Sequence, residues 1–251
     1  HKNVILVVME SMSFSFMEKG GEANHLTPVL DSLAKQGLLF SNTYATGTRT
    51  VRGLEAVTLS IPPGPGSSIV KRPKNENLFS LGFLFQERGY DTRFIYGGYG
   101  YFDNMNYFFA HNGFKTVDRA NFSLEEKTFA NAWGLCDEDL FHKVIQEANQ
   151  SYAAHHPFFH VVMTTSNHRP YTFPEGRINA PHTGGHRIPA VQYADFAIGE
   201  LIKNAQKEHW FNNTVFVFVA DHTASSAGKW AVTPEKHRIP FIIYSPGFIK
   251  P

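Results

Sequence analysis

Three largely apolar runs constrain the fold more than any other feature of this 251-residue chain. They cover residues 4–9, 158–165 and 214–220, and a shorter run at 241–244 resembles them. Continuous runs rich in β-branched and aromatic residues are typical of strands buried on both faces of a parallel sheet. Because helix signals fall between them, the sequence predicts an α/β fold, a doubly wound sandwich with a largely parallel central sheet.

The length allows one large α/β domain, so we expect residues 1–251 to form a single catalytic domain. Thr27 followed by Pro28 marks a helix start, and Asp137 is expected to cap another helix. Further strands are predicted at 38–45 and 92–96, and helices at 27–36, 80–88, 137–152 and 190–205.

Charge and cysteine content exclude several classes of protein. The formal net charge is +1, so no basic stripe indicates a nucleic-acid partner. The single cysteine, Cys136, excludes an internal disulfide and a cysteine-based zinc site. No apolar run reaches the length that spans a bilayer. Since the first strand follows directly on His1, we expect any membrane anchor to lie upstream of the given residues.

Polar residues follow the predicted strands at the points where they end. Glu10 follows the first run, His168 lies just beyond the second, and Asp221-His222 follows the third. The carboxyl ends of parallel strands share one edge of a sheet, where such folds bind ligands. Carboxylate and imidazole groups together suit a divalent ion such as Mn²⁺, Zn²⁺ or Mg²⁺. The sequence therefore predicts a metal site at this edge.

A stretch of threonine and arginine, residues 45–56, precedes a predicted helix. It carries the hydroxyls of Thr46, Thr48 and Thr50 and the guanidiniums of Arg49 and Arg52. A hydroxyl near a helix N-terminus and flanked by arginine is well placed to meet a phosphate or sulfate. The alternative is a threonine-rich turn that merely caps the helix. Chemistry alone leaves all three threonines open as nucleophiles.

Phosphoryl chemistry explains why these residue types are needed together. A threonine hydroxyl is a weak nucleophile at neutral pH, and coordination to a divalent ion activates it. Arg49 or Arg52 can hold a second phosphoryl oxygen as charge develops. His168 can protonate a departing alcohol or bind the transferred group.

Four motifs in this order resemble a known family. They are VVMES at 7–11, ATGTRTVRGLEA at 45–56, TSNHRPY at 165–171 and ADH at 220–222. The chain resembles the extracytoplasmic catalytic domain of lipoteichoic acid synthase-like proteins, a branch of the sulfatase and alkaline phosphatase superfamily. That branch includes periplasmic phosphoglycerol transferases. The resemblance implies a metal-bound threonine that attacks phosphatidylglycerol and passes glycerophosphate to an acceptor hydroxyl.

Matched motif by motif, the resemblance assigns roles to individual residues. It implies that Thr50 is the nucleophile and a metal ligand, and that His168 contacts the substrate. Arg49 lies where the teichoic acid synthases carry a different basic residue, and His237 lies where relatives can place a further active-site histidine. The remaining metal ligands implied are Glu10, Asp221 and His222.

One loop departs from the family pattern. Gram-positive synthases hold glycerol phosphate with a tryptophan and an arginine in the loop that corresponds to residues 99–105. Here Asp103 and Asn104 occupy that loop, and neither family residue is present. We expect both to face the substrate. The difference favours a Gram-negative-type transferase or hydrolase with another acceptor.

The sequence thus predicts a membrane-associated, periplasmic enzyme that moves phosphoglycerol from a phospholipid head group to a glycan or glycerol-type acceptor. A phosphodiesterase, phosphatase or sulfatase-type hydrolase with the same core is the alternative. Thr50 cannot be converted to formylglycine, which disfavours a true sulfatase. A non-catalytic lipid- or glycan-binding domain would not need Glu10, Thr50, Asp221 and His222 together.

Overall fold

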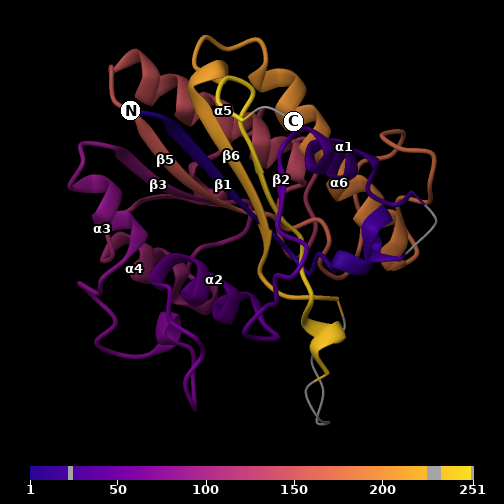
Figure 1. The fold of residues 1–251 in the computed structure, drawn as a ribbon, viewed down its shortest axis with the longest axis horizontal. Helices are drawn as coiled ribbons and strands as arrows, with labels where there is room; N and C mark the ends of the chain where they lie inside the picture. The colour runs from indigo at the N-terminus through magenta and orange to yellow at the C-terminus, as the bar shows by residue number, and fades with distance from the viewer. Residues whose placement is uncertain (22–24, 225–232, 250–251) are drawn as a thin grey trace.

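A seven-stranded sheet forms the middle layer of the computed structural model, which describes residues 1–21, 25–224 and 233–249 (Figure 1). The strands are β1 (Asn3–Met9), β2 (Leu38–Leu39), β3 (Asp91–Tyr96), β4 (Lys115–Val117), β5 (Phe158–Met163), β6 (Thr214–Ala220) and β7 (Phe241–Tyr244). Their order is β2-β7-β6-β1-β5-β3-β4. The five adjacent strands β6, β1, β5, β3 and β4 run parallel to one another. β7 is antiparallel to β6, and β2 is antiparallel to β7. The predicted largely parallel sheet is confirmed.

Helices cover both faces of the sheet, as expected for a doubly wound sandwich (Figure 1). One face carries α1 (Pro28–Gln36), α5 (Asp137–Ala153) and α6 (Arg187–Ala205), and the other carries α2 (Thr50–Leu59), α3 (Leu81–Gln86) and α4 (Met105–Ala110). None of the described helices combines the length and apolarity required to cross a bilayer. Short 3₁₀ turns lie at Phe14–Phe16, Glu18–Gly20, Ile69–Lys71, Phe102–Asn104, Arg119–Asn121, Phe211–Asn213 and Pro234–His237.

The three apolar runs of the sequence become the three central strands, β6, β1 and β5. Every residue of β5 is buried, as is every residue of β1 except the half-buried Val4. Met9 pairs with Ala220 of β6, and Val8 pairs with Met163 of β5. Because the three strands end nearly level, the residues that follow them emerge at one place on the carboxyl edge. This register positions the candidate site.

The strand predicted at 38–45 is wrong in length. Only Leu38 and Leu39 pair with β7, and Tyr44 makes an isolated bridge to Arg238. The Thr43 hydroxyl donates to the carbonyl of Phe40 at 3.1 Å, which closes a turn through the polar residues between them. Side-chain hydrogen bonds of this kind compete with strand pairing.

Asp137 is not the cap of α5, contrary to the sequence prediction. Cys136 holds the N-cap position and Asp137 is the first helical residue. The buried Asp137 carboxylate accepts hydrogen bonds from the backbone N–H groups of Thr165 at 2.9 Å and Ser166 at 3.1 Å. Burial nevertheless raises the pKa of Asp137 to about 6. The side chain therefore ties α5 to the loop after β5.

The other predicted helices are confirmed with shifted ends. α6 begins at Arg187, three residues before the predicted start, because Pro189 falls in its first turn, where no helical N–H partner is lost. α3 is shorter than predicted, and the Ser80 hydroxyl accepts from the N–H of Phe83 at 3.2 Å as its N-cap. α1 begins at Pro28 with Thr27 as its N-cap residue, as predicted, but the Thr27 hydroxyl donates to the carbonyl of Phe16 at 3.1 Å rather than capping the helix.

Gly53 sets how closely α2 approaches the end of β6. A methyl group at this position would lie 2.4 Å from the carbonyl oxygen of Asp221 and 2.6 Å from its Cα. Backbone atoms cannot yield as a flexible side chain can. Only glycine therefore lets the first turn of α2 rest on the Asp221 backbone.

We expect Gly53→Ala to destabilise the protein by about 1–3 kcal/mol, because the helix must move off the strand end. In an unhindered helix the same change would stabilise the protein by roughly 1 kcal/mol. The sign of the change in unfolding free energy therefore shows whether the added methyl group clashes with the Asp221 backbone. Urea unfolding measures it. Gly64→Ala is the control, since the added methyl would meet only the tip of Arg72 at 4.0 Å. A more stable Gly53→Ala protein would contradict the close approach.

His160 is a titratable residue inside β5. Its side chain is fully buried, and neither ring nitrogen has a hydrogen-bond partner among the described residues. Burial, together with the charge of Arg93, lowers the pKa of His160 to about 3. The unfolded chain binds a proton near pH 6.5 while the folded protein does not. Acid therefore favours unfolding through this residue.

We predict that His160 lowers the free energy of unfolding by about 2 kcal/mol when the pH falls from 7.5 to 5. The loss accumulates at roughly 1.4 kcal/mol per pH unit below the pKa of the unfolded state. His160→Leu should remove that loss, so its stability relative to the wild type should rise as the pH falls. Urea unfolding at both pH values measures the difference. Phe158→Leu, a nearby buried change without a titratable group, should shift stability equally at both. If His160→Leu also shifted stability equally at both pH values, the prediction would be refuted.

Candidate active site

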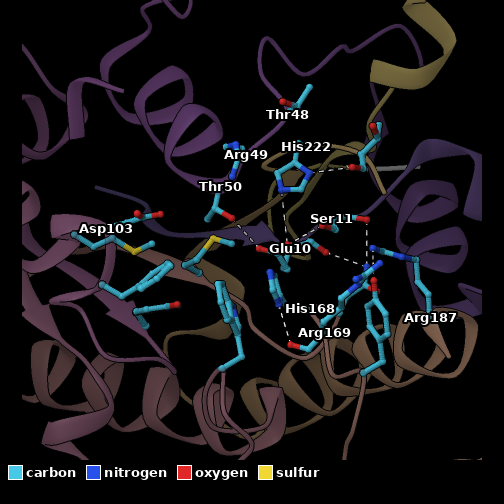
Figure 2. A pocket seen from close by; sticks show the side chains of 18 residues that line it. Glu10, Ser11, Thr48, Arg49, Thr50, Asp103, His168, Arg169, Arg187 and His222 are labelled. Atoms are coloured by element: carbon cyan, nitrogen blue, oxygen red, sulfur yellow. Dashed lines mark hydrogen bonds and ion pairs between the residues drawn. The ribbon is translucent and has the colours of Figure 1, made fainter. Parts of the chain in front are cut away.

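The polar strand ends open into one cavity of about 470 Å³ at the carboxyl edge of the sheet. Figure 2 shows the 18 side chains that line it, which come from segments far apart in the sequence. Glu10, Thr50, His168 and His222 all lie on it, as the sequence predicts. Asp221 lies directly behind, bonded to the same group of residues. The convergence expected for parallel strands is therefore present.

Glu10, Asp221 and His222 form a compact group whose ligand atoms all lie within 4.8 Å of one another. The His222 Nε2 atom is 3.7 Å from Oε1 of Glu10 and 3.3 Å from Oδ2 of Asp221. Both carboxylates are 1% exposed. Two buried carboxylates and an imidazole at these distances are a donor set for Mn²⁺ or Zn²⁺.

The Asp221 carboxylate shows how well the group fits a cation. Its Oδ1 accepts backbone hydrogen bonds from Ser11 at 2.8 Å and His222 at 2.7 Å. Its Oδ2 is buried and has no hydrogen-bond partner among the described residues, although Nε2 of His222 lies 3.3 Å away. Burial, and then repulsion from Glu10, raise the pKa of Asp221 well above its usual range. A cation between the two carboxylates would offset both effects.

Thr50 is the first residue of α2 and points toward this group (Figure 2). Its hydroxyl donates to Oε2 of Glu10 at 3.1 Å. Arg49 precedes it as the N-cap residue, so Thr50 lies where the helix offers its unpaired N–H groups. Thr48 also lines the cavity, whereas Thr46 lines a separate apolar groove. The geometry favours Thr50 among the three threonines.

Two more predicted residues face the cavity. The Arg49 side chain is exposed beside Thr50. The Asp103 carboxylate also lines the cavity and forms an ion pair with Lys71 at 2.5 Å. The loop that carries Asp103 thus contributes to the wall of the cavity, and contact of Asp103 with the substrate stays a prediction.

Three predicted substrate residues are directed elsewhere and do not line the cavity. Arg52 pairs with Glu55 at 2.8 Å, and its second nitrogen donates to the carbonyl of Gly66. The Asn104 amide donates to the carbonyl of Val70 at 3.0 Å, so it fixes a loop. Nδ1 of His237 lies 3.2 Å from the carbonyl of Ala45. These contacts stabilise neighbouring segments.

His168 lies on the Glu10 side of the cavity (Figure 2). Its Nδ1 lies 2.9 Å from the carbonyl of Arg169. This contact engages one ring nitrogen with the backbone and leaves Nε2 for a substrate. A group so placed can donate a proton or a hydrogen bond within the cavity.

Several cavity residues were missed by sequence reasoning. The Ser11 hydroxyl donates to Oε1 of Glu10 at 2.7 Å, and Asn167 donates to the Glu10 carbonyl at 3.0 Å. Both adjoin predicted residues, so their position at strand ends could have revealed them. Arg187 reaches the cavity from the start of α6 and donates to the Tyr171 hydroxyl. No local signal marks it.

A family comparison matches this arrangement. The sulfatase family model aligns with residues 2–251. The chain belongs to the sulfatase family. The lipoteichoic acid synthase of Staphylococcus aureus is 26% identical over 238 residues, which are 88% of this chain and 36% of that protein. This sulfatase-family chain therefore spans about a third of that curated relative.

Solved structures agree with this placement in the sulfatase family. An alkaline phosphatase superfamily protein from Vibrio parahaemolyticus superposes with a TM-score of 0.93 at 40% identity, over 100% of this chain and 61% of that one. The lipoteichoic acid synthase LtaP from Listeria monocytogenes has a TM-score of 0.85 at 22% identity, over 98% of this chain and 66% of that one, which shows the shared fold. The predicted membership of this chain in the lipoteichoic acid synthase-like branch of the superfamily, whose members are enzymes, is confirmed.

We expect Asp221→Asn to stabilise the metal-free sulfatase-family domain at pH 8 by about 1–3 kcal/mol, because it removes the cost of burying a second carboxyl group beside Glu10. Asparagine keeps the oxygen that accepts from Ser11 and His222. The same change should abolish the rise in melting temperature on adding Mn²⁺, which for wild type at 100-fold the dissociation constant corresponds to about 2.7 kcal/mol. Thermal unfolding with and without Mn²⁺ measures both effects.

Asp103→Asn is the matched control, since this carboxylate lines the same cavity but pairs with Lys71. It should keep the full response to Mn²⁺. A full response in Asp221→Asn would show that the ion binds elsewhere.

Proposed function

We propose that this domain transfers phosphoglycerol from a phospholipid such as phosphatidylglycerol to an acceptor hydroxyl, in a metal-dependent reaction through phospho-Thr50. The observation that carries the proposal is the Thr50 hydroxyl, 3.1 Å from Glu10 at the N-terminus of a helix. It lies beside three groups that could hold an ion. The relationship to a lipoteichoic acid synthase supports the choice of phosphoglycerol.

In the first step the Thr50 hydroxyl loses its proton to solvent, its oxygen attacks phosphorus, and the bond from phosphorus to the diacylglycerol oxygen breaks. Glu10, Asp221 and His222, with Thr50, would hold a divalent ion, which favours ionisation of the threonine hydroxyl and neutralises charge on the phosphoryl oxygens. Glu10 accepts the hydrogen bond from Thr50 and so aims its oxygen into the cavity.

Residues on the cavity wall serve the groups that enter and leave. His168, through Nε2, protonates the departing diacylglycerol oxygen and takes a proton from the acceptor hydroxyl in the second step. Arg49 binds a phosphoryl oxygen from the exposed side. In that second step the acceptor oxygen attacks phosphorus, and Thr50 regains its hydroxyl.

The proposal also assigns partners and a location. The donor is a phospholipid head group, and the acceptor is a hydroxyl of a glycan or glycerol-type molecule. Mn²⁺ is the proposed ion, with Zn²⁺ or Mg²⁺ as alternatives that share its oxygen and nitrogen ligands. The reaction then takes place at a membrane surface on the extracytoplasmic, periplasmic side. Asp103 lines the same cavity, in the loop at residues 99–105 where the synthases carry their tryptophan and arginine, and this difference favours an acceptor other than a teichoic acid chain.

We predict that Thr50→Ala lowers diacylglycerol release from phosphatidylglycerol by about 10³-fold or more, because among the described threonines only Thr50 donates its hydroxyl to the Glu10 carboxylate. Thr50→Ser should retain part of the activity, since it keeps the oxygen. The assay uses purified protein with Mn²⁺ and follows both diacylglycerol and the labelled phosphoglycerol product.

Thr48→Ala is the control, since Thr48 lines the cavity two residues away, and its rate should stay within a few-fold of wild type. Release of free glycerol phosphate in place of a transferred product would identify a hydrolase. Diacylglycerol release that persists in Thr50→Ala would overturn the proposed nucleophile.

A further inference from the structure

We propose that Trp133 is a positioning residue that fixes the His168 ring for proton transfer. The inference rests on the proposed function of His168. The two rings are stacked with their centroids 3.5 Å apart and their planes parallel, at an interplanar angle of 0°. Both line the cavity. Trp133 therefore supports one face of the imidazole from the cavity wall.

The stack on Trp133 restricts the rotation of the His168 ring that its contact with the Arg169 carbonyl still allows. Nδ1 of His168 lies 2.9 Å from the Arg169 carbonyl, which holds one edge of the ring. An imidazole held by one hydrogen bond can still tilt about it, because the terminal torsion of histidine is broad. The indole face opposes that tilt. Nε2 is thereby kept pointing toward Glu10, as the labelled His168 in Figure 2 shows.

A rigid turn carries Trp133. The Asn131 side-chain oxygen accepts hydrogen bonds from the N–H groups of Trp133 at 2.8 Å and Gly134 at 3.2 Å. The Asn131 amide nitrogen donates to the Thr172 hydroxyl at 3.1 Å, which joins the turn to the loop beyond His168. The indole is thus fixed relative to the imidazole that it stacks on.

Close packing beneath the turn leaves it little room to move. A methyl group on Gly134 would lie 3.0 Å from the carbonyl oxygen of Gly97 and from a Thr165 side-chain carbon. The next residue, Leu135, donates its N–H to the same Gly97 carbonyl at 3.0 Å. Phe102 packs edge-on against the indole, with centroids 5.1 Å apart. These contacts make Trp133 a fixed wall.

A double-mutant cycle tests the proposal. Trp133→Leu should lower kcat for donor turnover by roughly 10-fold, with a smaller change in KM, because the substrate still binds while the proton donor is misplaced. In a His168→Gln background, Trp133→Leu should cause no further loss, since the indole acts through the imidazole. Trp133→Phe should restore most of the rate by keeping an aromatic face. Equal losses in both backgrounds would overturn the proposal.

Two further measurements separate this role from a general structural one. Tyr101→Leu changes a 77% exposed aromatic residue near the cavity, and its small effect should be the same in both His168 backgrounds. Independently of activity, the His168 ring protons should resonate upfield in wild type and return toward the ordinary range in Trp133→Leu. Unshifted wild-type resonances would disprove the stack. If wild type turns over no lipid donor, the proposed function fails, and the resonances alone decide the placement of Trp133.

Discussion

The level ending of three parallel strands is the constraint on which the site depends. Because β6, β1 and β5 stop together, Asp221 and Glu10 emerge side by side and are both buried. Two like charges out of water repel each other, and the repulsion contributes to the raised pKa of Asp221. Backbone donors satisfy one Asp221 oxygen, while the other has no hydrogen-bond partner in the described part of the chain. A cation between the two carboxylates would offset that repulsion.

The layers around the sheet deliver the remaining chemistry to that pair. α2 can rest on the Asp221 backbone only because Gly53 has no side chain, and this contact brings Thr50 to Glu10. From the opposite wall, the loop after β5 brings His168 against Trp133. The nucleophile and the proton donor therefore reach the same ion-binding group from separate segments, each fixed by packing outside the cavity.

The central fold and the metal group could be predicted because they depend on local patterns. Apolar runs in the sequence predict buried strands, and the carboxyl ends of parallel strands share one edge of the sheet. These two facts predict that Glu10, Asp221 and His222 lie together. The Arg52–Glu55 pair also has a local signal, the i to i+3 spacing of a helix, which sequence reasoning overlooked in favour of a phosphate contact. Arg187, at the start of α6, and Trp133, in a turn before α5, reach the cavity through long-range packing, for which one sequence carries no period or spacing.

Anomalous X-ray diffraction from a Mn²⁺-soaked crystal, recorded on both sides of the manganese absorption edge, tests the central claim most directly. We predict one manganese peak bonded to Glu10, Asp221 and His222, with the Thr50 oxygen completing its ligands. A peak bonded to other residues, or no peak among these four at saturating Mn²⁺, would contradict the account.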